Sequence, residues 1–374
     1  MQLNPMDKWL NLNASAPYNL GESGVKNLII QDLFDLMKES TDFFQLDFDH
    51  NDTQGSLDLR MEVCALYDNI TPDQVLITTG VTEAIMLYFS TSFKLDENVV
   101  VITPSFHNLY DFPELTGFEV KKIELKYENQ FRLPLEMIQK AVNNQTRAIV
   151  LTSPSNPLGV VHTQKELEAI LEISKPFSCD VVIDEHYRLM PYNKLNNFTS
   201  LDSSSDRIIR FGSPGKCLGC VGLRVGWLIA RKDILEQCLS YKSYTTHAIF
   251  KGNDYFAQQI LKHRTSLGEK FKNWIQQNIS HFAAFQSKNH EYIEWIEPQA
   301  GTVGFPRLIL TTNSFEFADK LLKETGVLVL PGECFNMPGF FRLRLGVEPD
   351  YFQEAIKRMQ TMIHYARPAN CNVE

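Results

Sequence analysis

The feature that most constrains the fold is an alternation of short apolar runs with longer segments of helical period between about residues 60 and 230. Several of the runs are apolar nearly throughout, which is typical of strands covered on both faces. Helical segments lie between them, and Thr163 and Glu166 offer a capping box at the start of one of these. The alternation predicts an α/β fold with a mostly parallel seven-stranded sheet. The predicted strands are 74–79, 98–103, 118–125, 147–153, 180–185, 207–213 and 225–230, and the predicted helices are 81–93, 133–144 and 163–174.

The pattern changes after about residue 265. Helical segments at 267–282, 314–326 and 351–366 alternate with extended ones at 301–310 and 340–347, which indicates a smaller α+β domain. We expect the N-terminal segment to complete this small domain. The predicted organisation is therefore 1–45 for that segment, 46–265 for a large domain and 266–374 for the small domain, with a long helix near 232–265 as the bridge.

Composition limits the class of protein. A net charge of −9 and a pI near 5.6 argue against a nucleic-acid binder. The sequence has no apolar run long enough to span a bilayer and no signal peptide at its start, so we expect a cytoplasmic protein without a membrane partner. Seven cysteines make a disulfide framework improbable, and Cys217 and Cys220 lack the second ligand pair that zinc needs. We expect no metal site.

Residues suited to ligand binding follow the predicted strands, at the sheet edge where ligands bind in such folds. The stretch TTGVTEA puts a glycine at a strand-to-helix turn, which could bind an anion or be only a turn. Asp184 ends an apolar strand, and burying it would be costly unless it met a cation or a protonated ring nitrogen. The residues in these positions are Gly80, Val81, Thr82, Phe106, His107, Asn156, Asp184, Tyr187, Ser213 and Lys216.

Lys216 lies in the glycine-rich run FGSPGKCLGCVGLRVGW. It could be a solvated loop cation, or an amine whose pKa is lowered by burial so that it acts as a nucleophile. A phosphate cradle, an aromatic face, an amide, a buried carboxylate and a lysine at one sheet edge together meet the needs of pyridoxal phosphate. We therefore predict this cofactor.

The ordered motif set resembles the fold type I aminotransferases of class I/II over nearly the whole chain. The resemblance implies that Lys216 binds the cofactor aldehyde and that Asp184 partners the pyridine nitrogen. Tyr187, which could also be a core tyrosine, would donate to the phenolic oxygen together with Asn156. Phe106 would stack on the ring. The implied phosphate ligands are Gly80, Val81, Thr82, Ser213 and Arg224.

The same resemblance assigns Arg344 of FRLRLGV to the substrate carboxylate, while Arg342 could face solvent. It assigns Gly24, with Ser23 and Glu22 beside it, to an N-terminal substrate loop. One departure is clear: the stretch LDFDHNDTQGSLDLR lacks the tyrosine with which family members reach the partner subunit's phosphate. We expect a homodimer in which Asp47, Asp49, His50 or Glu22 holds a substrate guanidinium, although a solvated acidic loop explains these residues equally well.

The stretches ESGVKN, TPSFHNLY, GTVGFPR and GVLVLPGECF resemble the hydroxyarginine cyclases of this family, which form capreomycidine or enduracididine. That resemblance implies loss of water from a hydroxylated arginine and ring closure by its guanidine, with His107 assisting departure of the hydroxyl. An ordinary aminotransferase using a keto-acid acceptor is the alternative. A non-catalytic sensor would need a DNA-binding module and a basic linker, and the sequence shows neither.

Overall fold

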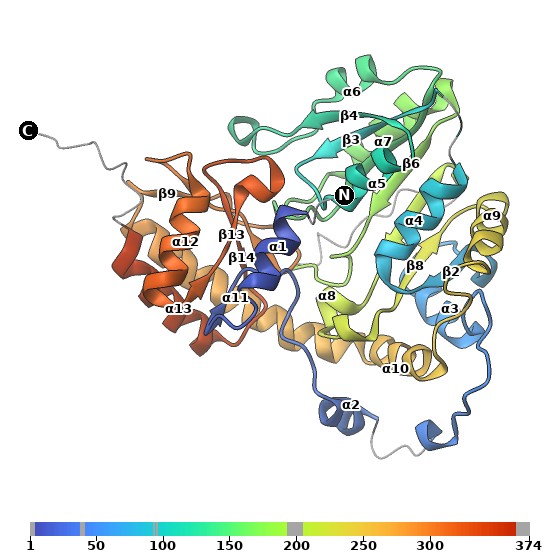
Figure 1. Cartoon of the computed structure of the whole chain (residues 1–374), viewed down its shortest axis with the longest axis horizontal. Coiled ribbons are helices and arrows are strands. Elements are labelled where there is room, and N and C mark those ends of the chain that lie inside the picture. The colour runs from blue at the N-terminus through green and yellow to red at the C-terminus, as the bar shows by residue number, and fades with distance from the viewer. Residues whose placement is uncertain (1–3, 38–41, 93, 95, 193–204, 364–374) are drawn as a thin grey trace, which may run out of the picture.

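The computed structural model describes residues 4–37, 42–92, 94, 96–192 and 205–363. Its central sheet has seven strands in the order β2-β8-β7-β6-β5-β3-β4, and all seven coincide with predicted strands (Figure 1). β8 runs antiparallel to β2 and β7, and the other pairs are parallel. The predicted α/β class is confirmed. The strands are β2 (Val75–Thr78), β3 (Asn98–Thr103), β4 (Glu119–Glu124), β5 (Thr146–Thr152), β6 (Asp180–Asp184), β7 (Ile208–Gly212) and β8 (Gly226–Ile229).

Helices cover both faces of this sheet because its strands are apolar on both sides. Alternate strand residues enter different cores: Val100 and Ile102 join one hydrophobic cluster, and Val99 and Val101 join the other. The predicted capping box of α7 forms, with the Thr163 amide donating to Glu166 at 2.8 Å. The helices are α3 (Leu57–Cys64), α4 (Gly80–Ser92), α5 (Asn108–Leu115), α6 (Leu135–Ala141), α7 (Gln164–Ser174), α8 (Gly215–Leu218), α9 (Lys232–Lys242) and α10 (Lys251–Lys262).

The C-terminal elements form a second, smaller assembly around a three-stranded sheet of order β10-β14-β13. The predicted strand at 301–310 divides into two short strands on either side of Pro306, which has no N–H to donate. The elements are α11 (Arg264–Lys288), β9 (Ile293–Glu294), β10 (Val303–Gly304), β11 (Arg307–Leu308), α12 (Ser314–Thr325), β12 (Val327–Leu328), β13 (Leu330–Pro331), β14 (Phe341–Arg344) and α13 (Pro349–Met362).

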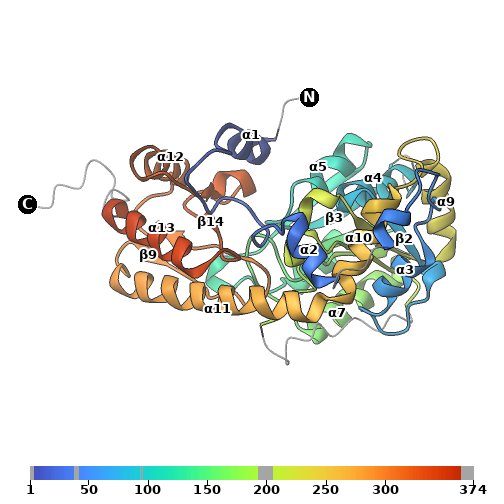
Figure 2. The ribbon, with the colours of Figure 1, turned by 90° about the horizontal axis from the view of Figure 1, so that it is seen from below.

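The N-terminal segment packs on these C-terminal elements. β1 (Tyr18–Asn19) pairs in parallel with β12, and α1 (Pro5–Leu12) contacts β13. Figure 2 shows α1 above β14, on the side away from α11. This arrangement agrees with the expectation that the segment completes the small domain, while the domain boundaries themselves stay a prediction.

The predicted bridging helix near 232–265 is wrong. α9 ends at Lys242 and α10 begins at Lys251, and His247 in the turn between them adopts a left-handed φ of 59°. The long helix is α11, with 25 residues, which contacts α8 and α10 at one end and α13 at the other (Figure 2). Among the helices of the described residues, none is both long enough and apolar enough to cross a bilayer.

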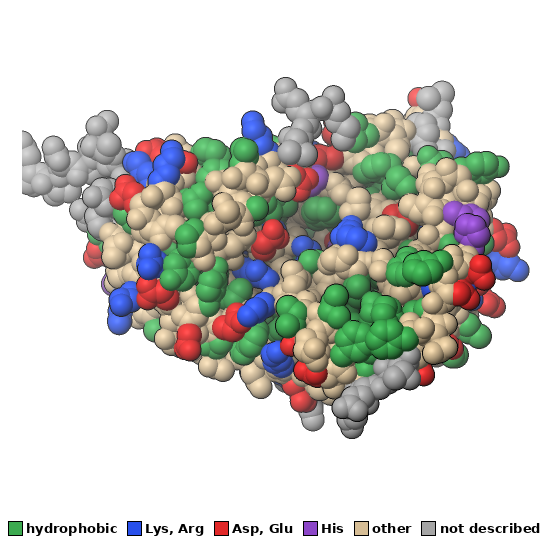
Figure 3. Space-filling model, turned by 60° about the horizontal axis from the view of Figure 1, so that its bottom comes forward, with side chains coloured by type: hydrophobic (Ala, Val, Ile, Leu, Met, Phe, Trp, Pro, Cys, Tyr) green, Lys and Arg blue, Asp and Glu red, His purple; other side chains and the backbone are tan. Residues whose placement is uncertain are grey.

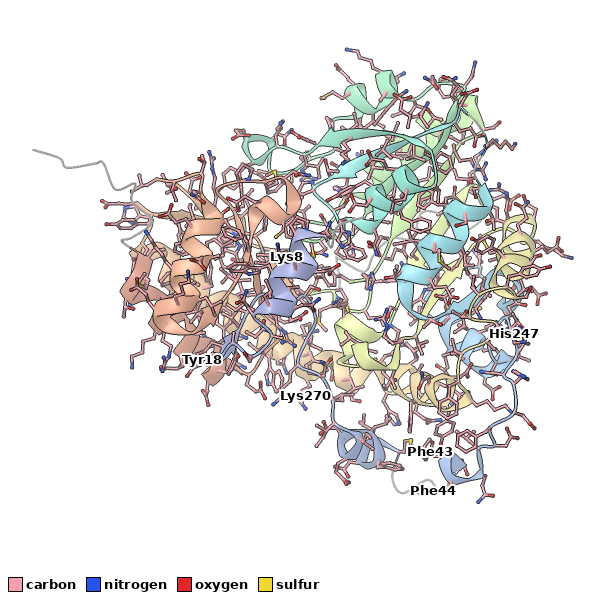
Figure 4. All side chains as sticks on the ribbon, viewed as in Figure 1. Lys8, Tyr18, Phe43, Phe44, His247 and Lys270 are labelled. Carbon is pink, nitrogen blue, oxygen red and sulfur yellow. The ribbon has the colours of Figure 1, made fainter. Side chains whose placement is uncertain are left out.

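Hydrophobic side chains gather on the face that carries α2 (Ile30–Leu36) (Figure 3). Ile29, Ile30 and Phe44 are 66%, 71% and 70% exposed. Phe44 stacks on Phe34 with ring centroids 6.1 Å apart, and Figure 4 shows Phe43 and Phe44 together below α10. This face therefore exposes more apolar surface than the scattered leucines of an ordinary surface.

Candidate active site

A cavity of about 270 Å³ lies at the carboxyl ends of the central strands, between the large sheet and the N-terminal segment. Most of the residues that the sequence singled out meet there. Those that line the cavity are Glu22, Ser23, Gly80, Val81, Thr82, Phe106, Asn156, Asp184, Tyr187, Ser213, Lys216 and Arg224. Since they come from segments far apart in the sequence, only the fold brings them together.

Lys216 extends into this cavity from α8, directly after β7. Burial is the main cause that lowers the pKa of Lys216 to about 8; the Glu22 carboxylate opposes it, and the nearby guanidinium groups of Arg342, Arg344 and Arg224 act in the same direction as burial. Gly24 packs against the lysine: a Cβ at that position would lie 3.3 Å from Lys216 Cδ. A desolvated amine of this kind has a sizeable neutral fraction near neutral pH, which a nucleophile needs.

One end of the cavity is suited to an anion. α4 begins at Gly80, whose φ is +74°, and a Cβ there would lie 2.6 Å from the Arg224 Nη2 atom. Only glycine lets the guanidinium lie this close to the helix N-terminus. Ser213 is held beside it, donating to the Val225 carbonyl at 2.7 Å and accepting from the Gly215 amide at 3.1 Å. The positive helix end and the arginine together fit a phosphate.

The Asp184 carboxylate is buried, with 1% of the residue exposed, and lines the cavity. Its Oδ1 atom accepts the His186 backbone amide at 3.1 Å and lies 3.1 Å from His186 Nδ1. His186 also lines the cavity, and sequence reasoning gave it no role. A carboxylate kept this dry needs a cationic or donating partner, which a protonated pyridine nitrogen provides.

A further group of polar side chains in the cavity consists of Tyr187, Asn156 and Arg342. The Tyr187 hydroxyl donates to the Ser23 carbonyl at 2.9 Å, and burial raises the pKa of Tyr187 to about 12. Arg342 donates from Nη1 to Asn156 Oδ1 at 3.1 Å and from Nη2 to the Gly21 carbonyl at 2.7 Å. Each Nη atom donates one N–H to these partners and carries a second N–H, so the guanidinium can still bind a ligand in the cavity that Arg342 lines.

Of the two arginines on β14, Arg342 lies at the cavity and the predicted Arg344 does not. The sequence allowed Arg342 to face solvent, but the residue is 1% exposed and lines the cavity. Arg344 does not line it, because its guanidinium donates to the carbonyl oxygens of Gly24 and Val25. The two arginines alternate on β14, and the period of two alone cannot tell which of them faces the ligand.

His107 also departs from its predicted catalytic position, because it does not line the cavity. It is 6% exposed and lies behind Phe106, with ring centroids 4.8 Å apart. Its Nδ1 lies 3.1 Å from Asp111 Oδ2, and its Nε2 lies 3.5 Å from Asp7 Oδ2. The histidine therefore connects α5 to α1 rather than facing a reacting group.

α1 supplies a part of the cavity wall that sequence reasoning missed entirely. Asp7 and Asn11 line the cavity from this helix, together with Met6 and Leu10. Trp9 anchors the helix by donating to the Val329 carbonyl at 3.0 Å. The eight-residue amphipathic pattern of α1 gave no sign of which residues it would turn toward the site.

Asp49 and His50, predicted to bind substrate, do not line the cavity of the same subunit. Both are exposed, and the His50 ring lies 5.4 Å from the His247 ring. Figure 4 shows His247 at the edge of the molecule, far from Lys8 on α1. Asp47 is likewise exposed and pairs with Lys251. None of these three residues lines the cavity that contains Lys216.

Comparison with known proteins places this geometry in a family. The chain matches the family of class I and II aminotransferases over residues 8–359, and it belongs to that family. It is 26% identical over 320 residues to aromatic-amino-acid aminotransferase 2 of Thermococcus litoralis, with 83% of this chain and 82% of that protein covered. It is 25% identical over 346 residues to capreomycidine synthase of Streptomyces vinaceus, with 91% and 88% covered.

Solved structures share the fold over almost the full length. A PLP-dependent aminotransferase from Streptococcus suis superposes with a TM-score of 0.92 at 24% identity, with 99% of both proteins covered. The PLP-dependent cyclase OrfR superposes with a TM-score of 0.89 at 21% identity, with 98% of both proteins covered. At these identities the likeness shows the fold, which is fold type I.

One cofactor is consistent with the family, with the anion-binding end of the cavity at Gly80 and Arg224, and with Lys216 and Asp184 after their strands. The protein is a PLP-dependent enzyme of the aminotransferase superfamily, and its cofactor is pyridoxal phosphate. The cavity fits this group: it combines the helix N-terminus at Gly80 and the Arg224 guanidinium at one end with the buried Asp184 carboxylate and Lys216.

Proposed function

We propose that the protein is a PLP-dependent cyclase that converts a hydroxylated L-arginine into a cyclic guanidino amino acid. The observation that carries this proposal is the pair of carboxylates, Asp7 and Glu22, that line the cavity in addition to Asp184. An amino acid with a cationic side chain needs carboxylates at that end of the site. The similarity to capreomycidine synthase over 91% of the chain supports the same conclusion.

The residues of the cavity divide into cofactor and substrate groups. Arg224, Ser213 and the Gly80 turn would hold the phosphate, and Asp184 would hold the pyridine nitrogen. Arg342 is assigned to the substrate carboxylate, because it lines the cavity and its guanidinium is fixed by Asn156 and the Gly21 carbonyl. Asp7 and Glu22 would take the guanidinium.

Bound pyridoxal phosphate makes the Cα proton of a substrate amino acid acidic and accepts the resulting electron pair. Lys216 Nζ is the base placed to take this proton, since burial lowers its pKa to about 8. The bond between the hydroxyl oxygen and its carbon then breaks, and the hydroxyl leaves with a proton as water. A guanidine nitrogen held by Asp7 and Glu22 forms the new C–N bond at that carbon and gives up one proton, and Lys216 would return a proton to Cα, so substrate and product differ by one water. For a hydroxyl on Cγ, a Cβ proton must also be removed before the hydroxyl leaves and be returned after ring closure.

Holding the guanidine in the cavity makes ring closure intramolecular, which raises its effective concentration. A hydroxyl on Cβ leads to a six-membered ring and a hydroxyl on Cγ to a five-membered ring. His107 does not line the cavity, so it would act on the reaction through Asp7 rather than on the leaving hydroxyl.

Incubation of the purified holoenzyme with 3- and 4-hydroxyarginine, without a keto acid, tests the proposal. A product lighter than the substrate by one water, formed over many turnovers, is the expected result. An equimolar amount of keto acid with conversion of the cofactor to pyridoxamine phosphate, and turnover only when an acceptor is supplied, would establish an aminotransferase instead. The similarity to aromatic-amino-acid aminotransferase 2 makes that the second candidate.

We also propose that the enzyme works as a homodimer. The exposed apolar face formed by Ile29, Ile30 and Phe44 gives a second copy a surface to bury, and twofold dimers are the commonest symmetric assemblies. Asp49 and His50 would then act across the interface, since neither lines the cavity of its own subunit. A fully active monomer at micromolar concentration in sedimentation velocity would contradict this arrangement.

A further inference from the structure

His186 stands out among the cavity residues because neither the expected cofactor contacts nor the proposed reaction uses it. It follows Asp184 by two residues, at the carboxyl end of β6, and its side chain is 19% exposed where it lines the cavity. Its backbone carbonyl accepts a hydrogen bond from Cys217 Sγ at 3.4 Å, so the residue is tied to the helix that carries Lys216. A histidine ring at this position can hydrogen-bond to the neighbouring Asp184 carboxylate.

Two nitrogen atoms of His186 lie close to a single oxygen of Asp184. The backbone amide donates to Asp184 Oδ1 at 3.1 Å, and the ring Nδ1 lies 3.1 Å from the same atom. Because both contacts use Oδ1, they fix the rotation of the carboxylate and leave Oδ2 for another partner. Asp184 is 1% exposed, so no bulk water competes for these contacts.

We propose that His186 is a positioning residue for Asp184: its Nδ1–H donates to Oδ1 and holds the carboxylate so that Oδ2 is directed toward the pyridine nitrogen of the cofactor. A hydrogen bond donated to a carboxylate is stronger than one between neutral groups. The inference concerns binding of the cofactor and does not depend on which amino acid the enzyme converts.

Three substitutions separate the ring nitrogens. His186→Asn places an amide N–H near the position of Nδ1, His186→Gln places it near Nε2, and His186→Leu has no donor. Each variant keeps the backbone amide that donates to Asp184. The measurement is calorimetric binding of pyridoxamine phosphate to the apoprotein, because this form of the cofactor carries no aldehyde and cannot bond to Lys216.

We expect the affinity of His186→Asn for pyridoxamine phosphate to stay near that of the native protein. His186→Leu and His186→Gln should both bind about tenfold more weakly, the size of one hydrogen bond to a charged group. An equal loss of affinity in all three variants would mean that the His186 ring contributes packing and no hydrogen bond. An unchanged affinity in His186→Leu would contradict the proposal.

A carbocyclic cofactor analogue, with C–H in place of the ring nitrogen, controls for general damage to the site. The difference between native protein and His186→Leu should disappear with this analogue, and it should also disappear when both carry Asp184→Ala. Nitrogen-15 spectra of the native apoprotein should show the His186 proton on Nδ1. A proton on Nε2 alone, or a His186→Leu loss that persists in the Asp184→Ala background, would overturn the assignment.

Discussion

The cavity has two walls of different origin. The strand-end wall consists of residues that follow β2, β3, β5, β6 and β7, and the N-terminal wall consists of α1 and residues 22–23. The first is fixed by the paired strands of the central sheet. The second is held by the two-residue pairing of β1 with β12, by burial of Met6 and Trp9, and by side-chain hydrogen bonds such as Trp9 to the Val329 carbonyl and Asn4 to Asp111. This difference suggests that the rigid wall holds the cofactor, while the N-terminal wall selects the substrate.

The largest effect should come from the strand-end wall. Lys216→Ala should abolish the visible absorption of the lysine-bound cofactor and lower kcat by about 10²- to 10⁴-fold, because the base for the Cα proton is lost. The measurement is steady-state turnover together with peptide mapping after borohydride reduction.

Lys242 provides a matched control for that substitution. It is also buried, but its Nζ donates to the carbonyl oxygens of Thr53 and His247 at 3.1 and 2.7 Å, away from the cavity. Lys242→Met should keep the absorption band. Recovery of trapped cofactor on the peptide that contains Lys242 would show that the lysine assignment is wrong.

The lowered pKa of Lys216 predicts how pH governs cofactor capture. With a pKa of about 8, roughly a tenth of the amine is neutral at pH 7, far more than for an ordinary lysine. The capture rate of the apoprotein should rise about fiftyfold from pH 6 to pH 8 and then level off, as measured by stopped-flow absorbance. A midpoint near 10 would contradict the burial argument.

The lowered pKa of Lys216 also makes the free energy of unfolding depend on pH. Between pH 8 and the ordinary lysine pKa of 10.5, the unfolded protein binds more protons at this residue than the folded apoprotein does. The contribution of Lys216 to the free energy of unfolding therefore rises with pH across that window and is constant below it. Lys216→Met should flatten the slope there, as measured by denaturant unfolding at a series of pH values.

Substitutions of the two arginines of β14 should have different effects on KM. Arg342→Ala should raise KM for the amino acid by about 10- to 100-fold, since a charge-assisted pair with the substrate carboxylate is lost. Arg344→Ala should have a smaller effect, because Arg344 holds the carbonyl oxygens of Gly24 and Val25. A larger KM effect for Arg344 would restore the sequence-based assignment.

Asp7 tests the N-terminal wall directly. Its side chain is 46% exposed, so solvent screens its charge, and Asp7→Asn should weaken binding of arginine only about two- to fivefold. Binding of citrulline, which has the same shape without the charge, should not change. Asp35→Asn on α2, an equal change of charge outside the cavity wall, serves as the control. An equal loss of affinity for arginine and for citrulline would mean that Asp7 does not distinguish a charged side chain from a neutral one.

The two walls also differ in how far the sequence predicts them. The strand-end residues were predictable because the carboxyl ends of parallel strands share one edge, so Asp184 and Lys216 had to lie near each other. Asp7 was not predictable, since its position depends on how α1 docks against α5 through His107. His186 stands between Asp184 and Tyr187 in the sequence, but its contact with Asp184 depends on a side-chain rotamer that no pattern specifies.

The smallest effect should come from the anchor of α1. Trp9→Phe keeps a ring against Phe315, with centroids 4.9 Å apart in the native protein, but removes the hydrogen bond to the Val329 carbonyl. One such bond is worth about 1 kcal/mol, so α1 should leave the cavity more often and KM should rise about two- to fivefold with kcat nearly unchanged. If α1 acts on the substrate through Asp7, Trp9→Phe and Asp7→Asn both weaken the same contact between Asp7 and the substrate. The double variant should then raise KM by less than the product of the two single effects. Full multiplication of the two effects would show that Trp9 and Asp7 act independently, and the N-terminal wall would then not be a single unit.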